Sequence, residues 1–169
     1  LPMYPSKIGV VTSEDAAAWE DIKKTITNRF PLVELILSHT LVQGDKAPVM
    51  ISEAISALNE FSDIDVIILA RGGGSPEDLL PFNDELVARA IFGSVIPVVT
   101  GIGHENDWTI ADEVSDVRAA TPTAAAAVTV PDLVELHELV KFNQITLTNR
   151  LSTVINQIDS DLKLFVSQL

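Results

Sequence analysis

Three polar loops follow apolar segments of the sequence and carry residue types suited to phosphate chemistry. The first holds Thr12 and Ser13, the second runs from Arg71 through three glycines to Ser75, and the third is GIGHENDW at 101–108. An arginine beside a glycine-rich turn can hold a phosphate between its guanidinium fork and backbone N–H groups. The second loop therefore indicates an anion-binding site.

The Arg71–Ser75 segment has two interpretations. In the functional one, Arg71 buries its carbon stem and turns its guanidinium into a crevice, while Gly72, Gly73 and Gly74 let the backbone approach a ligand closely. In the structural one, the glycines form an ordinary strand-to-helix turn, and Arg71 pairs with one of the many nearby acidic residues. The residue types alone leave both open.

His104 and Asp107 stand three residues apart in the third loop. A histidine can act as a general acid, a general base or a metal ligand, and a close carboxylate can orient it or bind a divalent cation. Alternatively, Asp107 caps a helix that begins near Trp108, and His104 fills a hydrogen-bonding gap. We interpret His39 and His137, which have no such companions, as surface or packing residues.

Asp21 lies eight residues beyond Ser13, within a predicted helix. At 1.5 Å per residue, this places it about 12 Å from the helix start. From its pattern alone, Asp21 is predicted to be an exposed acid paired with Lys24.

Apolar strand-sized segments alternate with amphipathic helical ones, which is typical of a doubly wound, mostly parallel sheet with helices on both faces. Helix-start chemistry follows the first strand at Thr12 or Ser13, and Ser75 precedes a proline at a predicted helix start. The predicted strands are 7–12, 32–38, 65–70 and 96–100, and the predicted helices are 13–29, 49–61 and 75–92, the last with a kink at Pro81.

Beyond residue 101 the alternation gives way to helices: a short one in TIADEV, one capped at Thr121-Pro122, and a long one from 131 to 169. The long segment contains neither Gly nor Pro, and its apolar residues recur with a mean spacing of about 3.6, as on one stripe of a helix. We expect an α/β domain at 1–130 and a long helix at 131–169, whose stripe another helix or subunit covers.

The 169 residues include no cysteine, which excludes disulfides and thiolate metal sites. No apolar run approaches the length of a membrane span, so no membrane partner is expected. The net charge is −13, and residues 51–130 hold only three basic residues, Arg71, Arg89 and Arg118. This charge argues against nucleic-acid binding unless basic contacts come from elsewhere.

The motifs GVVTSEDAAAWEDI, VQGDKAP, ARGGGSPEDLLPFNDE and IPVVTGIGHENDWTIADEVSDVRAATPTAAA together resemble the large subunit of bacterial exodeoxyribonuclease VII. The match covers about 5–130, and the tail to 169 is similar to the start of that family's C-terminal helical arm. The resemblance implies a cytoplasmic nuclease that degrades single-stranded DNA from either end to short oligonucleotides. It also implies several copies of a small subunit bound through the arm, and an N-terminal oligonucleotide-binding (OB-fold) domain that is absent from this chain.

Position by position, the resemblance implies that four residues are essential for cleavage: Asp21, Arg71, His104 and Asp107. Asp21 and Asp107 would then bind Mg²⁺ or position His104, and Ser13 and the Gly72–Ser75 segment would contact phosphate. Hydrolysis by water is the expected reaction. The alternative is a nucleotide- or sugar-phosphate-binding α/β module without hydrolytic activity.

The chain departs from the family pattern at two positions. Ala127 stands where a glutamate is usual after the alanine run, and Ala16 stands where the first motif often has glycine. The first departure removes any role of that carboxylate here. The second affects only helix packing.

Overall fold

The computed structural model describes residues 1–72, 76–104 and 106–167. The chain divides into two units, Leu1–Pro131 and Asp132–Leu169. The first unit contains the sheet and the helices that pack on it, and the second is a single helix.

The sheet has five parallel strands in the order β2-β1-β3-β4-β5. The order reverses between β1 and β3, and this is the topological switch point at which ligands bind in open α/β sheets. The predicted doubly wound parallel sheet is thus confirmed. The strands are β1 (Lys7–Thr12), β2 (Glu34–His39), β3 (Val66–Ala70), β4 (Val98–Gly101) and β5 (Val117–Arg118).

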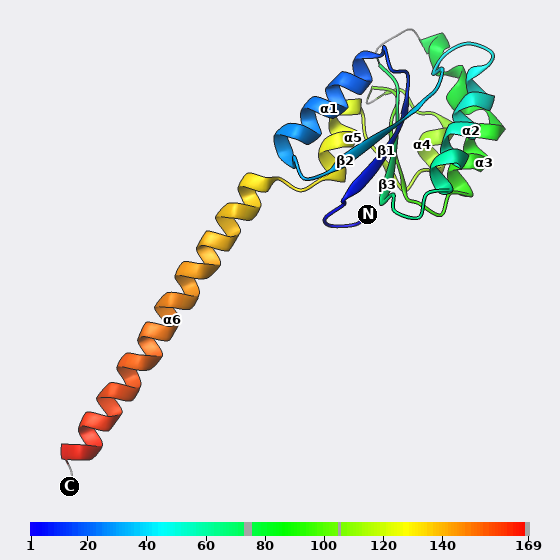
Figure 1. The fold of residues 1–169 in the computed structure, drawn as a ribbon. Coiled ribbons are helices and arrows are strands. Elements are labelled where there is room, and N and C mark those ends of the chain that lie inside the picture. Colours follow the sequence, from blue (N-terminus) through cyan, green and yellow to red (C-terminus); the bar gives the residue numbers. More distant parts are fainter. Residues whose placement is uncertain (73–75, 105, 168–169) are drawn as a thin grey trace. The chain divides into compact units, whose positions relative to one another are not determined.

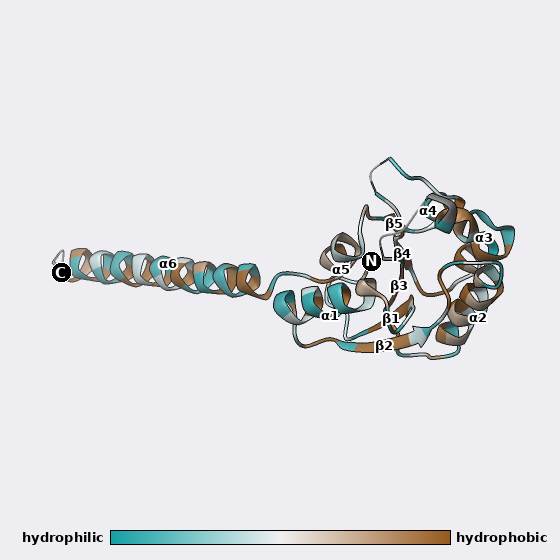
Figure 2. Cartoon of the chain, turned by 90° about the horizontal axis from the view of Figure 1, so that it is seen from above, coloured by the Kyte–Doolittle hydropathy of each residue, from teal (hydrophilic) through white to brown (hydrophobic). Residues whose placement is uncertain are grey.

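Helices cover both faces of the sheet (Figures 1 and 2). One face carries α1 (Ala17–Arg29) and α5 (Pro122–Thr129), which pack on each other; the other carries α2 (Ala47–Asn59), α3 (Glu85–Phe92) and α4 (Ile110–Val114). All five residues of β3 are fully buried between these layers, as its uninterrupted apolar sequence requires. The main apolar core lies on the α2 and α3 face.

The predicted start of the first helix is wrong. The helix begins at Ala17 rather than at Ser13, and its N-cap, Ala16, makes no side-chain capping bond. The preceding residues form a turn in which the Ala16 N–H donates to the Ser13 carbonyl at 3.1 Å. His39 holds this turn, because its Nδ1 accepts a hydrogen bond from the Glu14 N–H at 3.1 Å.

The predicted helix at 75–92 is two elements rather than one kinked helix. A 3₁₀ segment, η1, spans Pro76–Asn83, and α3 then begins after Asp84, whose side chain accepts from the Leu86 N–H at 2.8 Å. Pro81 lacks an N–H and its ring clashes with an α-helical turn before it, so the α-helix starts only beyond it.

The second unit is α6 (Leu133–Ser167), and none of its residues is buried. Figure 2 shows apolar and polar residues alternating along its whole length. The long helix predicted from the 3.6-residue spacing is present, and its apolar stripe is exposed to solvent. Within the described part of the chain, no helix is both long and apolar enough to cross a membrane.

Candidate functional site

The loops that follow β3 and β4 meet the start of α5 at the carboxyl edge of the sheet, the edge at which the parallel strands end. They enclose a small pocket of about 60 Å³. Its lining residues come from three separate stretches of sequence: Arg71 and Gly72, Ile102 to His104, and Ala120 to Pro122. The pocket therefore joins two of the residues singled out in the sequence, Arg71 and His104.

Arg71 is buried, with 6% of its surface exposed, at the wall of this pocket. Its Nη2 lies 3.1 Å from Oδ2 of Asp78 in η1. The structural interpretation of Arg71 as an ion-pair partner is therefore correct as far as it goes. A buried guanidinium at a pocket wall, held by a carboxylate, is also suited to gripping a phosphate oxygen.

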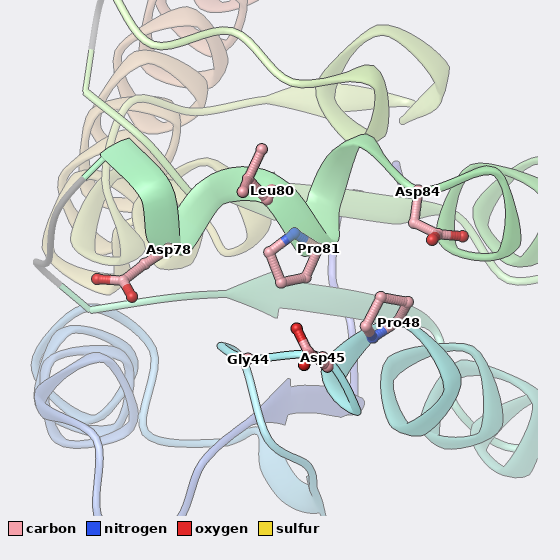
Figure 3. Close-up of a pocket in the computed structure, with 7 residues that line it drawn as sticks. All are labelled: Gly44, Asp45, Pro48, Asp78, Leu80, Pro81 and Asp84. Carbon is pink, nitrogen blue, oxygen red and sulfur yellow. The ribbon is translucent and has the colours of Figure 1, made fainter.

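A larger pocket of about 390 Å³ is lined in part by Asp78 (Figure 3). The loop before α2, the first turn of α2, η1 and the N-cap of α3 contribute to it, and three of its residues are aspartates. The lining residues are Gly44, Asp45, Pro48, Asp78, Leu80, Pro81 and Asp84. Three carboxylates repel an anion. A phosphate group is consequently favoured in the small pocket lined by Arg71 and disfavoured in this one.

His104 and Asp107 lie close together in the loop between β4 and α4, with His104 Nδ1 3.7 Å from Asp107 Oδ2. This separation is an ion-pair distance rather than a hydrogen bond, and such contacts can shorten once a substrate binds. The His104 side chain is 76% exposed and that of Asp107 is 40% exposed. His104 therefore does not fill a buried hydrogen-bonding gap.

Asp107 does not cap α4. The cap is Thr109, whose Oγ1 accepts from the Asp112 N–H at 3.2 Å, while the Thr109 N–H donates to Asp112 Oδ2 at 3.1 Å. This reciprocal pair is a capping box. The structural explanations offered for His104 and Asp107 from sequence are both wrong.

Gly103 permits the loop to fold back on itself. A Cβ atom at this position would lie 2.8 Å from the carbonyl oxygen of Asp107 and 2.9 Å from its Cβ. Only glycine allows this approach, and the approach places Asp107 beside His104.

Asp21 is exposed on α1, five residues into the helix counting from Ala17. Because α1 begins at Ala17, Asp21 lies about 6 Å along the helix from its first residue, rather than at the predicted distance of about 12 Å. Among the described residues, no hydrogen bond or ion pair joins its carboxylate to Arg71, His104 or Asp107.

The predicted pair with Lys24 is absent from the described contacts of α1, where Lys23 pairs with Glu20 at 2.6 Å. The first turn of the same helix lies near the loop after β3, because a Cβ on Gly72 would be 3.7 Å from the backbone nitrogen of Ala18. Asp21 thus lies on a helix whose first turn is near this loop, and no described contact joins its carboxylate to the other candidate residues.

The predicted phosphate-binding residues do not all line the same pocket. Gly72 lines the Arg71 pocket, whereas Ser13 lines a different one of about 250 Å³ with Leu41 to Gln43. Gly73, Gly74 and Ser75 lie outside the described residues.

One residue of the site was missed in the sequence. Arg118, on β5, donates from Nη2 to the carbonyl oxygens of His104 at 2.9 Å and Asp107 at 3.2 Å. The signal that could have revealed it is the scarcity of basic residues in an acidic segment. Of the three arginines between 51 and 130, two lie at the carboxyl edge.

Within the ranges that the structure describes, no group of three or more His, Asp or Glu side chains is arranged to hold a metal ion. Mg²⁺ needs few protein ligands, because it keeps several waters and binds through one or two carboxylates together with substrate phosphates. The half-exposed carboxylate of Asp107 fits that requirement. A metal site built only from protein ligands does not fit these residues.

The whole chain, residues 1–169, matches the family model described as exonuclease VII, large subunit. Three curated relatives are each named exodeoxyribonuclease 7 large subunit. That of Limosilactobacillus reuteri (strain DSM 20016) is 47% identical over 99% of this chain and 39% of its own length. Those of Brevibacillus brevis and Alkaliphilus metalliredigens are 55% and 50% identical, over 83% and 95% of this chain and 31% and 38% of their own lengths. The chain spans roughly a third of the length of these relatives.

Proposed function

The chain belongs to the exonuclease VII large-subunit family, and we propose that its α/β unit hydrolyses the phosphodiester bonds of single-stranded DNA. Digestion would proceed from either end and release short oligonucleotides. The observation that carries the proposal is the convergence of buried Arg71 and of His104, with its neighbour Asp107, at one pocket on the carboxyl edge. A cation for phosphate oxygens and an acid–base group for water are the two groups that hydrolysis needs most.

Each residue has a distinct role in the proposed reaction. Arg71 binds the scissile phosphate and stabilises the charge that develops on its oxygens. His104 takes a proton from the attacking water or gives one to the leaving sugar oxygen, and Asp107 orients the imidazole. Asp21 acts from α1, at the approach to the same edge.

Mg²⁺ is proposed as the metal, held by Asp107 and by Asp21 through substrate phosphate and water. When bound, it would neutralise phosphate charge and lower the pKa of a bound water. A Mg²⁺ ion held in this way does not require a cluster of three or more protein ligands, and the described residues contain none.

The chain carries many more acidic than basic residues, which bears on how it could bind DNA. With a net charge of −13, this chain gains little from phosphate neutralisation on its own, so further DNA contacts would come from segments or subunits outside it. The exposed apolar stripe of α6 is proposed to bind several copies of a small subunit. A cytoplasmic bacterial location is proposed with it.

The test is cleavage of end-labelled single-stranded DNA by the full-length large subunit carrying this sequence, assembled with its small subunit. His104→Ala and Asp107→Ala are compared with wild type, each with Mg²⁺ and with EDTA. Since general acid–base catalysis contributes about 10²–10⁴-fold, His104→Ala should lose at least about 10²-fold in rate. Asp63→Ala, an exposed acid paired with Lys7 at the opposite edge of the sheet, is the matched control and should cut as wild type does.

If His104→Ala and Asp107→Ala both cleave the DNA at the wild-type rate, the roles assigned to these residues are refuted. DNA left intact by wild type under every condition would refute hydrolysis itself and favour the phosphate-binding module. Full activity in EDTA would remove Mg²⁺ from the proposal.

A further inference from the structure

Arg118 holds the loop on which the proposed acid–base pair is mounted. It lies on β5, whose backbone pairs with β4, and its side chain reaches back over the β4–α4 loop. Nη2 donates to the carbonyl oxygen of His104 at 2.9 Å and to that of Asp107 at 3.2 Å. One nitrogen therefore joins the two residues that the proposed mechanism needs side by side.

This contact matters because the side chain of His104 is mostly exposed and that of Asp107 is half-exposed, so packing does little to hold them in place. Their relative position is set by the backbone, where the Asp107 N–H also donates to the His104 carbonyl at 3.0 Å. An arginine that fixes both carbonyls consequently sets the separation of the two side chains.

The guanidinium is itself fixed from two other directions. Its central carbon lies 4.0 Å from the centre of the Trp108 ring, and its Nε lies 3.8 Å from Oδ2 of Asp112. Asp112 is almost fully buried and accepts hydrogen bonds from the hydroxyls of Thr100 at 2.7 Å and Thr109 at 2.8 Å. Arg118 is thus anchored to the rigid end of the sheet and oriented toward the loop.

We propose that Arg118 is a positioning residue, which holds His104 and Asp107 in the geometry required for phosphodiester cleavage without contacting the DNA. The inference rests on the proposed nuclease function. Lysine cannot replace it, because an ammonium on a flexible stem cannot donate to both carbonyls while it also stacks flat on the indole and lies beside Asp112, as the planar guanidinium does.

The experiment uses Arg118→Lys in the full-length large subunit assembled with its small subunit. Lysine keeps a positive charge opposite buried Asp112, so folding is retained. Arg89→Lys is the matched control, since Arg89 is 77% exposed on α3 and its Nη2 contacts Glu85 at 2.6 Å. A second variant, Arg118→Gln, leaves Asp112 with its hydrogen bonds from Thr100 and Thr109 and is used if lysine disturbs folding.

Two readouts separate positioning from other roles. Steady-state cleavage of a single-stranded oligonucleotide gives kcat and KM. Acrylamide quenching of Trp108, measured on the 169-residue chain in a Trp19→Phe background that leaves Trp108 as its one tryptophan, reports on the loop without any substrate.

We expect Arg118→Lys to lower kcat about 10²-fold, as displacements of about 1 Å do, and to change KM by less than about threefold. Trp108 quenching should rise in the same variant, and Arg89→Lys should change none of these values. A kcat equal to wild type, or unchanged quenching, would overturn the proposal.

A raised KM with a shallower salt dependence would overturn it in favour of direct phosphate contact. An inactive wild type would overturn the nuclease function and this role in it, whereas an active wild type with an equally active Arg118→Lys overturns the positioning role alone.

Discussion

Replacing Gly103 with alanine should destabilise the α/β unit by forcing the β4–α4 loop open. The added Cβ would sit 2.8 Å from the Asp107 carbonyl oxygen and 2.9 Å from the Asp107 Cβ, where ordinary contact begins at 3.4 Å. Neither atom can rotate away, because one belongs to the backbone and the other is attached directly to it. The loop must therefore move by about half an ångström, against the hydrogen bonds from Arg118.

Overpacking of this kind costs about 1–3 kcal/mol in well-packed sites, and the lower half of that range, about 1.5 kcal/mol, applies to a loop that is partly exposed. The unfolding entropy of the 131-residue unit Leu1–Pro131 is about 0.28 kcal/mol/K at the average value per residue. The melting temperature of the α/β unit should then fall by about 5 °C.

The assay is thermal unfolding of the 169-residue chain followed by tryptophan fluorescence. Both tryptophans, Trp19 and Trp108, lie in the α/β unit, so α6 does not contribute to the signal. Gly72→Ala is the matched control: it lies in the neighbouring loop, its added Cβ would meet only the Ala18 nitrogen at an ordinary 3.7 Å, and its φ is not positive. Equal melting temperatures for the two variants would refute the assignment of Gly103 as the residue that lets Asp107 approach His104.

Two further predictions follow from the charges. Hydrogen bonds from the Ser6 backbone N–H and hydroxyl and from the Lys7 N–H hold the pKa of Asp65 below its ordinary value. The ionised Asp65 carboxylate therefore contributes its full stability above about pH 4, and this contribution is lost as the pH falls through the lower folded-state pKa. Asp65→Asn should cost about 1 kcal/mol in urea unfolding at pH 6 and progressively less toward pH 2.5, and a constant difference would contradict this origin. For single-stranded DNA binding by the 169-residue chain alone, we expect a plot of log K against log salt concentration to have a slope no steeper than about −0.7, which corresponds to one phosphate contact. The reason is that Arg118 contacts Asp112 within the protein, whereas Arg71 is the arginine that lines the pocket. A slope steeper than about −2 would show that other basic residues contact the DNA.

The order of strands and helices was predictable because the signals for it are local. The apolar run of β3 and the alternation with amphipathic segments require a covered parallel sheet, whichever residues end each element. Element ends were less predictable, because they depend on distant partners. The turn before α1 is held by His39 from the end of β2, and no pattern within 13–16 encodes that contact.

Strand β5 was missed for a related reason. It has only two residues, and it exists because the Asp116 carboxylate and the Val117–Arg118 backbone complete the edge of β4. Two residues carry no periodicity. Missing β5 also hid the role of Arg118, since only pairing with β4 brings its side chain to the loop that carries His104.

The candidate site was predictable in its residue types and only partly in its arrangement. Arg71 and His104 lie at one edge, as predicted, because each stands in the loop after a strand, and the carboxyl ends of parallel strands meet there. Ser13 also follows a strand, yet it lines a different pocket, since the turn at 13–16 directs it toward the loop after β2. Position after a strand thus selects the edge of the sheet, and the path of the individual loop decides which pocket a side chain reaches.

Two acids at the carboxyl edge explain how an acidic unit could still form the proposed phosphate site. Asp78 and Asp112 each contact one of the two arginines at the carboxyl edge, Arg71 and Arg118, and so hold those side chains in place at the expense of net positive charge. The edge therefore offers a fixed, directional guanidinium rather than a broad positive field. Such an arrangement favours stabilising charge on one phosphate over attracting a long polyanion. In the proposed nuclease, attraction of the DNA strand and chemistry on one phosphate would then be separate tasks, and this chain would perform the second.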